Sequence, residues 1–69
     1  MPKAREVYRA LLRDGWVMVR QEGTSHRVMR KGTKQEVWTH HDGVDLGNPM
    51  MARLARRFGY TLEQLRRLL

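Results

Sequence analysis

Residues 16–40, WVMVRQEGTSHRVMRKGTKQEVWTH, decide the fold of this chain. Runs rich in Val, Trp, Met and Thr have the composition of β-strands, and they occupy residues 16–22, 26–31 and 35–40. Two short segments that each contain a glycine separate these runs. Because connections this short join antiparallel neighbours, the stretch predicts a three-stranded meander.

Alternation along the strands divides their side chains between two faces of the predicted sheet. One face receives Val17, Val19, Val28 and Val37, and the other receives Trp16, Met18, Met29 and Trp38. Both faces are therefore apolar, and the sequence leaves open which of them the helices cover. His26 shares a face with Val28, whereas Arg27 shares the opposite face with Met29.

A helix is predicted before the strands, over residues 3–13. Its apolar residues recur at the i, i+3, i+4, i+7 and i+8 spacing of an amphipathic helix: Ala4, Val7, Tyr8, Leu11 and Leu12. Arg5, Arg9 and Arg13 recur every four residues on its outward side, where like charges repel unless an anion faces them.

Two further helices are predicted after a polar loop at residues 42–47. Asn48 is the expected cap of the first, which opens at Pro49 and ends at Gly59. Thr61 and Gln64 have the spacing of a capping box at the start of the second. The order α-β-β-β-α-α predicts one α+β domain over residues 1–69, with a three-stranded antiparallel sheet covered on one face by helices. This order resembles that of the double-stranded-RNA-binding domain.

Charge is the strongest compositional signal. Fourteen Lys and Arg stand against seven Asp and Glu, which gives a net charge of +7, and eleven of the fourteen are arginine. The guanidinium group matches phosphate with two parallel donors, so the bias favours a polyanionic partner, with an ordinary solvated surface as the alternative. There is no cysteine, no apolar stretch long enough to span a bilayer and no signal peptide, so we expect a cytoplasmic protein without membrane contact.

The segment Gly23-Thr24-Ser25-His26 carries the most specific signal. It follows Asp14-Gly15-Trp16 and an Arg-Gln-x-Gly strand end, and the chain closes near LARRFGYTLEQL, residues 54–65. Together these motifs resemble the HicA family of toxins, which are messenger-RNA interferases. The family often shows Gly-Ser-His where this chain has an added Thr24, and it commonly has a proline before the histidine that follows the third strand.

The resemblance implies an endoribonuclease with His26 as the catalytic residue, a HicB-type antitoxin partner and a role in the stress response. The chemistry agrees with a single histidine, because RNA supplies its own nucleophile, the 2′-hydroxyl. Imidazole changes charge near physiological pH and is suited to accept that proton as general base. We therefore expect neither a metal nor a cofactor, and a monomer or weak dimer when the protein is free.

RNA contacts are predicted for the residues around His26 and for the helix ridge: Arg20, Gly23, Thr24, Ser25, Arg27, Lys31, Lys34, Arg5, Arg9 and Arg13. Of these, the four cationic side chains of the sheet region are the candidates to stabilise charge on the phosphate, and the sequence does not rank them. His40 and His41 are neighbours that a strand would point to opposite faces, so they do not form a metal site together. Trp16 and Trp38 are either stacking platforms for bases or core residues, and core is the more common role.

Two other functions remain open at this level. Residues 54–69 also resemble a helix-turn-helix, in which Thr61, Gln64, Arg66 and Arg67 would contact duplex DNA. Charge and size are equally compatible with an RNA-binding protein that has no catalytic activity.

Overall fold

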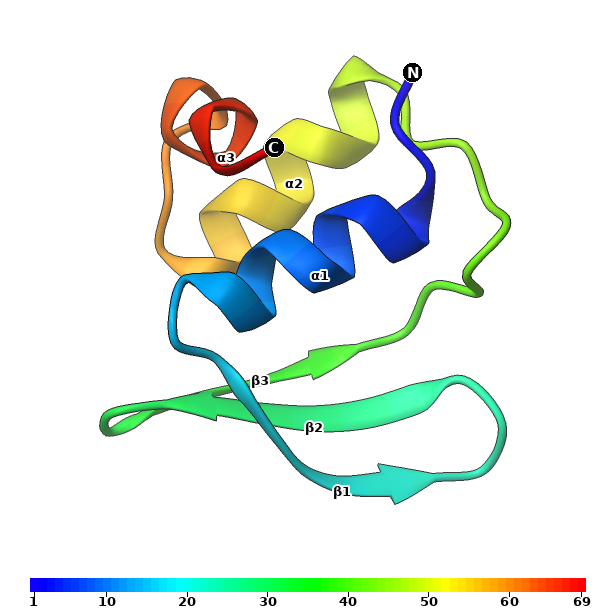
Figure 1. The fold of residues 1–69 in the computed structure, drawn as a ribbon, viewed down its shortest axis with the longest axis vertical. Helices are drawn as coiled ribbons and strands as arrows, with labels where there is room; N and C mark the ends of the chain where they lie inside the picture. The colour runs from blue at the N-terminus through cyan, green and yellow to red at the C-terminus, as the bar shows by residue number, and fades with distance from the viewer.

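The computed structural model describes residues 1–69 and has the element order predicted from the sequence. Helix α1 (Ala4–Arg13) precedes a meander of β1 (Val17–Glu22), β2 (His26–Lys31) and β3 (Lys34–Trp38). Helices α2 (Asn48–Phe58) and α3 (Leu62–Leu68) complete the chain. The sheet is open and antiparallel, in the order β1-β2-β3, and the three helices lie on one side of it (Figure 1). The predicted α+β fold, similar in order to a double-stranded-RNA-binding domain, is confirmed.

The third strand ends earlier than predicted, at Trp38 instead of His40. Beyond Trp38 the chain crosses to the start of α1, where the Ala4 N–H donates to the Val44 carbonyl at 2.8 Å and the Arg5 N–H donates to the Asp42 carbonyl at 3.1 Å. A helix leaves its first N–H groups without internal partners, and this loop satisfies them. The polar loop predicted from residue 42 therefore starts at residue 39.

The other helix and strand ends match the predictions or differ from them by one residue. β1 starts at Val17 instead of Trp16, and Asn48 is the first residue of α2 with Gly47 in the capping position. Gly59 ends α2 in the left-handed conformation, and the predicted capping box of Thr61 and Gln64 is present at α3. None of the helices is long and apolar enough to span a membrane.

The register of the strands settles which face the helices cover. Met18 pairs with Met29, and Arg27 pairs with Trp38, so these four residues share one face. Met29 and Trp38 on that face are buried in the core. His26 and Val28 alternate with them and lie on the opposite, open face, as alternation predicts.

The core fills the space between that inner face and the helices. Its aromatic centre is Trp16, Trp38 and Phe58, with the Trp16 and Phe58 rings 4.7 Å apart and edge to face. The remaining members of the cluster come from all three helices, from β2 and from the loop before α2: Ala4, Val7, Leu11, Met29, Leu46, Met51, Leu54, Ala55 and Leu65. Trp16 and Trp38 are 2% and 1% exposed, so they are core residues and not stacking platforms for bases.

A hydrogen-bonded cluster joins the ends of four elements at one side of the domain. The Trp16 indole N–H donates to the Tyr60 hydroxyl at 2.9 Å, and that hydroxyl donates to the carboxylate of Asp14. Lys31 donates to the same carboxylate at 2.8 Å. Asp14 follows α1, Lys31 ends β2 and Tyr60 precedes α3. The cluster therefore links the sheet to both ends of the helical layer, and it accounts for the Asp-Gly-Trp motif.

We predict that Tyr60→Phe destabilises the domain by about 1–3 kcal/mol, because it leaves the buried Trp16 N–H without its acceptor. For a chain of this length, each 1 kcal/mol lowers the melting temperature by roughly 4–8 °C. Thermal unfolding followed by circular dichroism measures the change. Tyr8→Phe is the matched control, since the Tyr8 hydroxyl makes no hydrogen bond. Equal melting temperatures for the two variants would contradict this role of Tyr60.

The same cluster predicts acid sensitivity. Hydrogen bonds from Lys31 and from Tyr60 lower the pKa of Asp14 below its ordinary value. A carboxyl whose pKa is depressed on folding adds stability above its unfolded pKa of about 3.9, and that stability is lost as the pH falls through the folded pKa. Urea unfolding at pH 7 and at progressively lower pH should show this loss. Asp14→Asn should be less stable than the wild type at pH 7 and should lose less stability in acid; an unchanged acid dependence would exclude Asp14 as a contributor.

Candidate active site on the open face of the sheet

His26 is exposed on the face of the sheet that the helices leave uncovered. It is the first residue of β2 and pairs with Glu22, so the hairpin between them contains only Gly23, Thr24 and Ser25. Gly23 has a φ of 68°, a conformation that favours glycine, and its carbonyl accepts a hydrogen bond from the Gln21 side chain at 3.3 Å. The turn thus presents the imidazole at the end of the hairpin, where a large ligand has free access.

Arg20 and Glu22 share the open face with His26. Glu22 is directly opposite His26, and Arg20 pairs with Val28, the next residue of β2 on this face. The Arg20 guanidinium contacts the Glu22 carboxylate at 3.4 Å, and their side chains are 61% and 58% exposed. An ion pair this exposed contributes little to stability, so Arg20 can exchange Glu22 for another anion at little cost.

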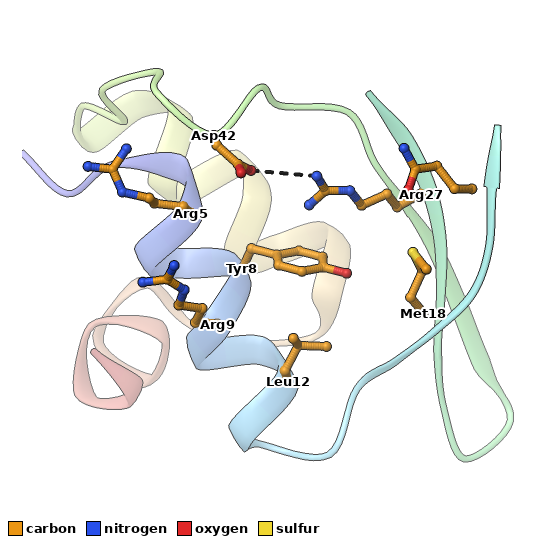
Figure 2. Close-up of a pocket in the computed structure, with 8 residues that line it drawn as sticks. Arg5, Tyr8, Arg9, Leu12, Met18, Arg27 and Asp42 are labelled. Atoms are coloured by element: carbon orange, nitrogen blue, oxygen red, sulfur yellow. Dashed lines mark ion pairs between the residues drawn. The ribbon is translucent and has the colours of Figure 1, made fainter. Parts of the chain in front are cut away.

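Arg27 follows His26 in the chain but lies on the inner face, against α1. Its guanidinium is 4.6 Å from the centre of the Tyr8 ring and 3.6 Å from the Asp42 carboxylate, and its side chain is only 19% exposed. Together with α1 it forms an open groove of about 380 Å³ (Figure 2). The groove is lined by Arg5, Tyr8, Arg9, Leu12, Met18, Gln21, Arg27 and Asp42.

The three arginines on the outward side of α1 lie on the helical side of the molecule. Arg5 and Arg9 line the groove, while Arg13 donates to the Leu68 carbonyl at 3.1 Å and so ties α1 to the end of α3. Arg9 and Arg13 also border a second, smaller groove of about 190 Å³ with Glu6 and Leu69. These arginines are therefore separated from His26 by the sheet.

Lys31 and Lys34 lie at the far end of the sheet from His26. The five-residue separation of His26 and Lys31 along β2 corresponds to roughly 17 Å at a strand's rise per residue. Lys31 is held by Asp14, which raises its pKa, and Lys34 follows the turn between β2 and β3. The structure does not bring these two lysines together with His26.

The other two histidines lie in the loop after β3 rather than on the strand. The His40 ring is half-buried and packs edge to face on Trp38 with ring centres 5.4 Å apart. Burial lowers the pKa of His40, and the nearby positive charge of Arg57 lowers it further. No group of three His, Asp or Glu side chains is placed to hold a metal ion.

The side chains that a helix-turn-helix would use to contact DNA have partners within the domain. Thr61 and Gln64 bond reciprocally in the capping box, at 2.8 and 3.1 Å. Arg66 donates to the Asn48 side chain, and Arg67 lies 3.8 Å from Glu63. This arrangement favours a structural role for α3 over a role in DNA recognition.

Sequence reasoning missed three residues around the site: Tyr8 and Asp42, which hold Arg27, and Glu22, which faces His26. Tyr8 was counted only as an apolar position of α1. Asp42 comes from a loop far along the chain, and its proximity to Arg27 follows from the crossing of that loop to α1. The pairing of Glu22 with His26 depends on the length of the hairpin loop. The positions of Glu22 and Gly23 in the sequence predict only where that loop begins.

The fold and the exposed hairpin histidine define a small basic α+β domain with one open sheet face. The family model of the HicA toxin of bacterial toxin-antitoxin systems matches residues 4–64, which is nearly the whole chain. The chain belongs to the HicA toxin family. No curated protein and no solved structure matched it.

Proposed function

We propose that this toxin is a metal-independent endoribonuclease that cuts messenger RNA on the open face of its sheet, with His26 as the general base. The observation that carries the proposal is the exposed histidine at the Gly23–His26 hairpin of a HicA-family chain. The open face supports it, because a long RNA strand can approach His26 without entering a closed cleft.

The reaction needs few groups from the protein. His26 accepts the proton of a 2′-hydroxyl while that oxygen attacks the adjacent phosphorus. The bond from phosphorus to the 5′-oxygen breaks, and the leaving oxygen takes a proton from water. The products are a 2′,3′-cyclic phosphate and a free 5′-hydroxyl. Because the nucleophile belongs to the substrate, the protein's part is to position the strand, to accept one proton and to stabilise charge on the phosphate.

RNA flanking the cleavage point extends over basic surfaces of the domain in this proposal. The turn residues Gly23, Thr24 and Ser25 contact the strand next to His26, where their amides and hydroxyls are available to phosphate oxygens. Arg5 and Arg9 attract the phosphates of RNA that reaches the groove beside α1. A HicB-type antitoxin is the proposed protein partner, since the family consists of toxins of toxin-antitoxin systems.

We predict that His26→Ala lowers the cleavage rate by at least roughly 10²–10⁴-fold, the usual contribution of a positioned base. Labelled RNA transcripts incubated with purified protein measure the rate. Cleavage by the wild-type protein should be the same with and without EDTA. A single 2′-deoxy substitution at the scissile nucleotide should block it.

Loss of cleavage in His26→Ala identifies His26 as the base only if this variant still folds and still binds RNA. His41→Ala is the matched control, because His41 is exposed in the loop after β3 and should leave the rate unchanged. Full activity of His26→Ala would exclude His26 as the base. Binding of RNA by the wild-type protein without any cleavage would instead identify an RNA-binding protein with no catalytic activity.

We further predict that Arg5→Ala and Arg9→Ala each weaken RNA binding and flatten its salt dependence. For single strands, each lost phosphate contact reduces the slope of log K against log salt by about 0.7. Fluorescence anisotropy at several salt concentrations, with RNA that carries the 2′-deoxy block, gives this slope. Arg53→Ala removes the same charge from α2 and serves as the control. Equal slopes for all three variants would show that the groove beside α1 does not contact RNA.

A further inference from the structure

A β-bulge in the edge strand changes which residues of β1 face His26. Met18 pairs with Met29, and the next pair along the ladder is Arg20 with Val28, so Val19 is an extra residue without a partner. Strict alternation from Val17 would place Val19 on the open face and Arg20 on the inner face. The bulge reverses this order from Arg20 onward. As a result Arg20 and Glu22 both lie on the face of His26.

We propose that Arg20 is the catalytic residue that binds the scissile phosphate and stabilises its negative charge while His26 removes the proton. The inference rests on the proposed ribonuclease function. Arg20 is the diagonal neighbour of His26, because it lies two residues from the directly opposed Glu22. Diagonal neighbours in an antiparallel pair are about 7–8 Å apart at the backbone, which long side chains span. A phosphate seated between the two side chains is within reach of both.

The other cations of the sheet region do not meet this condition. Arg27 points to the inner face and is held by Tyr8 and Asp42. Arg30 is on the open face, paired with Val17 and Gln35, but four residues along β2 place it roughly 13 Å from His26. Lys31 and Lys34 are farther still, at the end of the sheet.

The contacts of Arg20 in the free protein leave its guanidinium available to bind a phosphate. Its one ion pair in the free protein is the exposed contact with Glu22, which orients the guanidinium along the open face without burying it. A phosphate brings two non-bridging oxygens, and the guanidinium can bind both through parallel N–H donors. Bulges are found next to active sites, where they re-aim a side chain, and the unpaired Val19 has that effect on Arg20.

The test separates catalysis from binding. Single-turnover cleavage of a short RNA that spans a mapped cut gives the rate constant, and anisotropy with the same RNA carrying the 2′-deoxy block gives the dissociation constant. We expect Arg20→Ala to lower the rate constant by roughly 10²–10³-fold, as loss of a donor to a developing oxyanion does. Arg20→Lys keeps the charge but loses the two-donor geometry and should fall between the wild type and Arg20→Ala. Arg30→Ala, which removes the same charge from the same face, should leave the rate constant unchanged.

Circular dichroism spectra and melting curves establish that each variant is folded. A wild-type rate constant for folded Arg20→Ala, or equal losses in Arg20→Ala and Arg30→Ala, would overturn the role of Arg20. If His26→Ala is inactive in the same assay, the proposed ribonuclease function stands while the assignment of Arg20 fails. Failure of the wild-type protein to cut any RNA would overturn both.

Discussion

The helices of this 69-residue chain cover only one face of its three-stranded sheet. The organisation of the protein depends on which face that is. Met29 and Trp38 commit the inner face to the core, where Trp38 lies beside Tyr8 and Phe58. Val28 on the opposite face is also buried, yet no helix covers that face (Figure 1). Burial of the inner face therefore fixes the outward direction of His26, because residues alternate along β2.

The order of the helices and strands and the spacing of the apolar residues could be predicted from the sequence, because each depends on a local pattern of residues. Apolar spacing defined α1, and the glycine turns and β-branched runs defined the meander. The choice of inner face was not readable, since Val and Met or Trp offer apolar side chains on both faces. The indoles are fixed on the inner side by hydrogen bonds: the buried Trp16 donates its N–H to the Tyr60 hydroxyl, and the buried Trp38 donates its N–H to the His40 carbonyl. Those acceptors belong to segments outside the strands, so no strand pattern contains them.

The candidate site was predictable only in part, for a similar reason. The sequence singled out His26 from the hairpin motif and listed several arginines and lysines without ranking them. Ranking these cations by their distance from His26 requires knowledge of the bulge at Val19. The run of Val, Met and Val does not predict this bulge, because each of its residues is apolar and suits either face. Tertiary contacts do the rest: Asp14 holds Lys31 at the far end of β2, and Asp42 with Tyr8 holds Arg27 on the inner face. These contacts hold Lys31 and Arg27 away from the open face beside His26.

His26, the proposed base, lies on an open face instead of in a cleft, and this position constrains the proposed chemistry. A cleft excludes water and strengthens every charge interaction within it, whereas charges on an exposed sheet face are screened by solvent. An enzyme built this way gains little from burial and depends on the geometry of a few side chains and on the substrate's own nucleophile. In the proposed function, the +7 charge of the chain contributes mainly by attracting RNA, and side chains of the hairpin and the edge strand carry out the chemistry. An open face that admits RNA is also accessible to the surface of another protein, so a partner that covers the hairpin would block the substrate without any change in the fold.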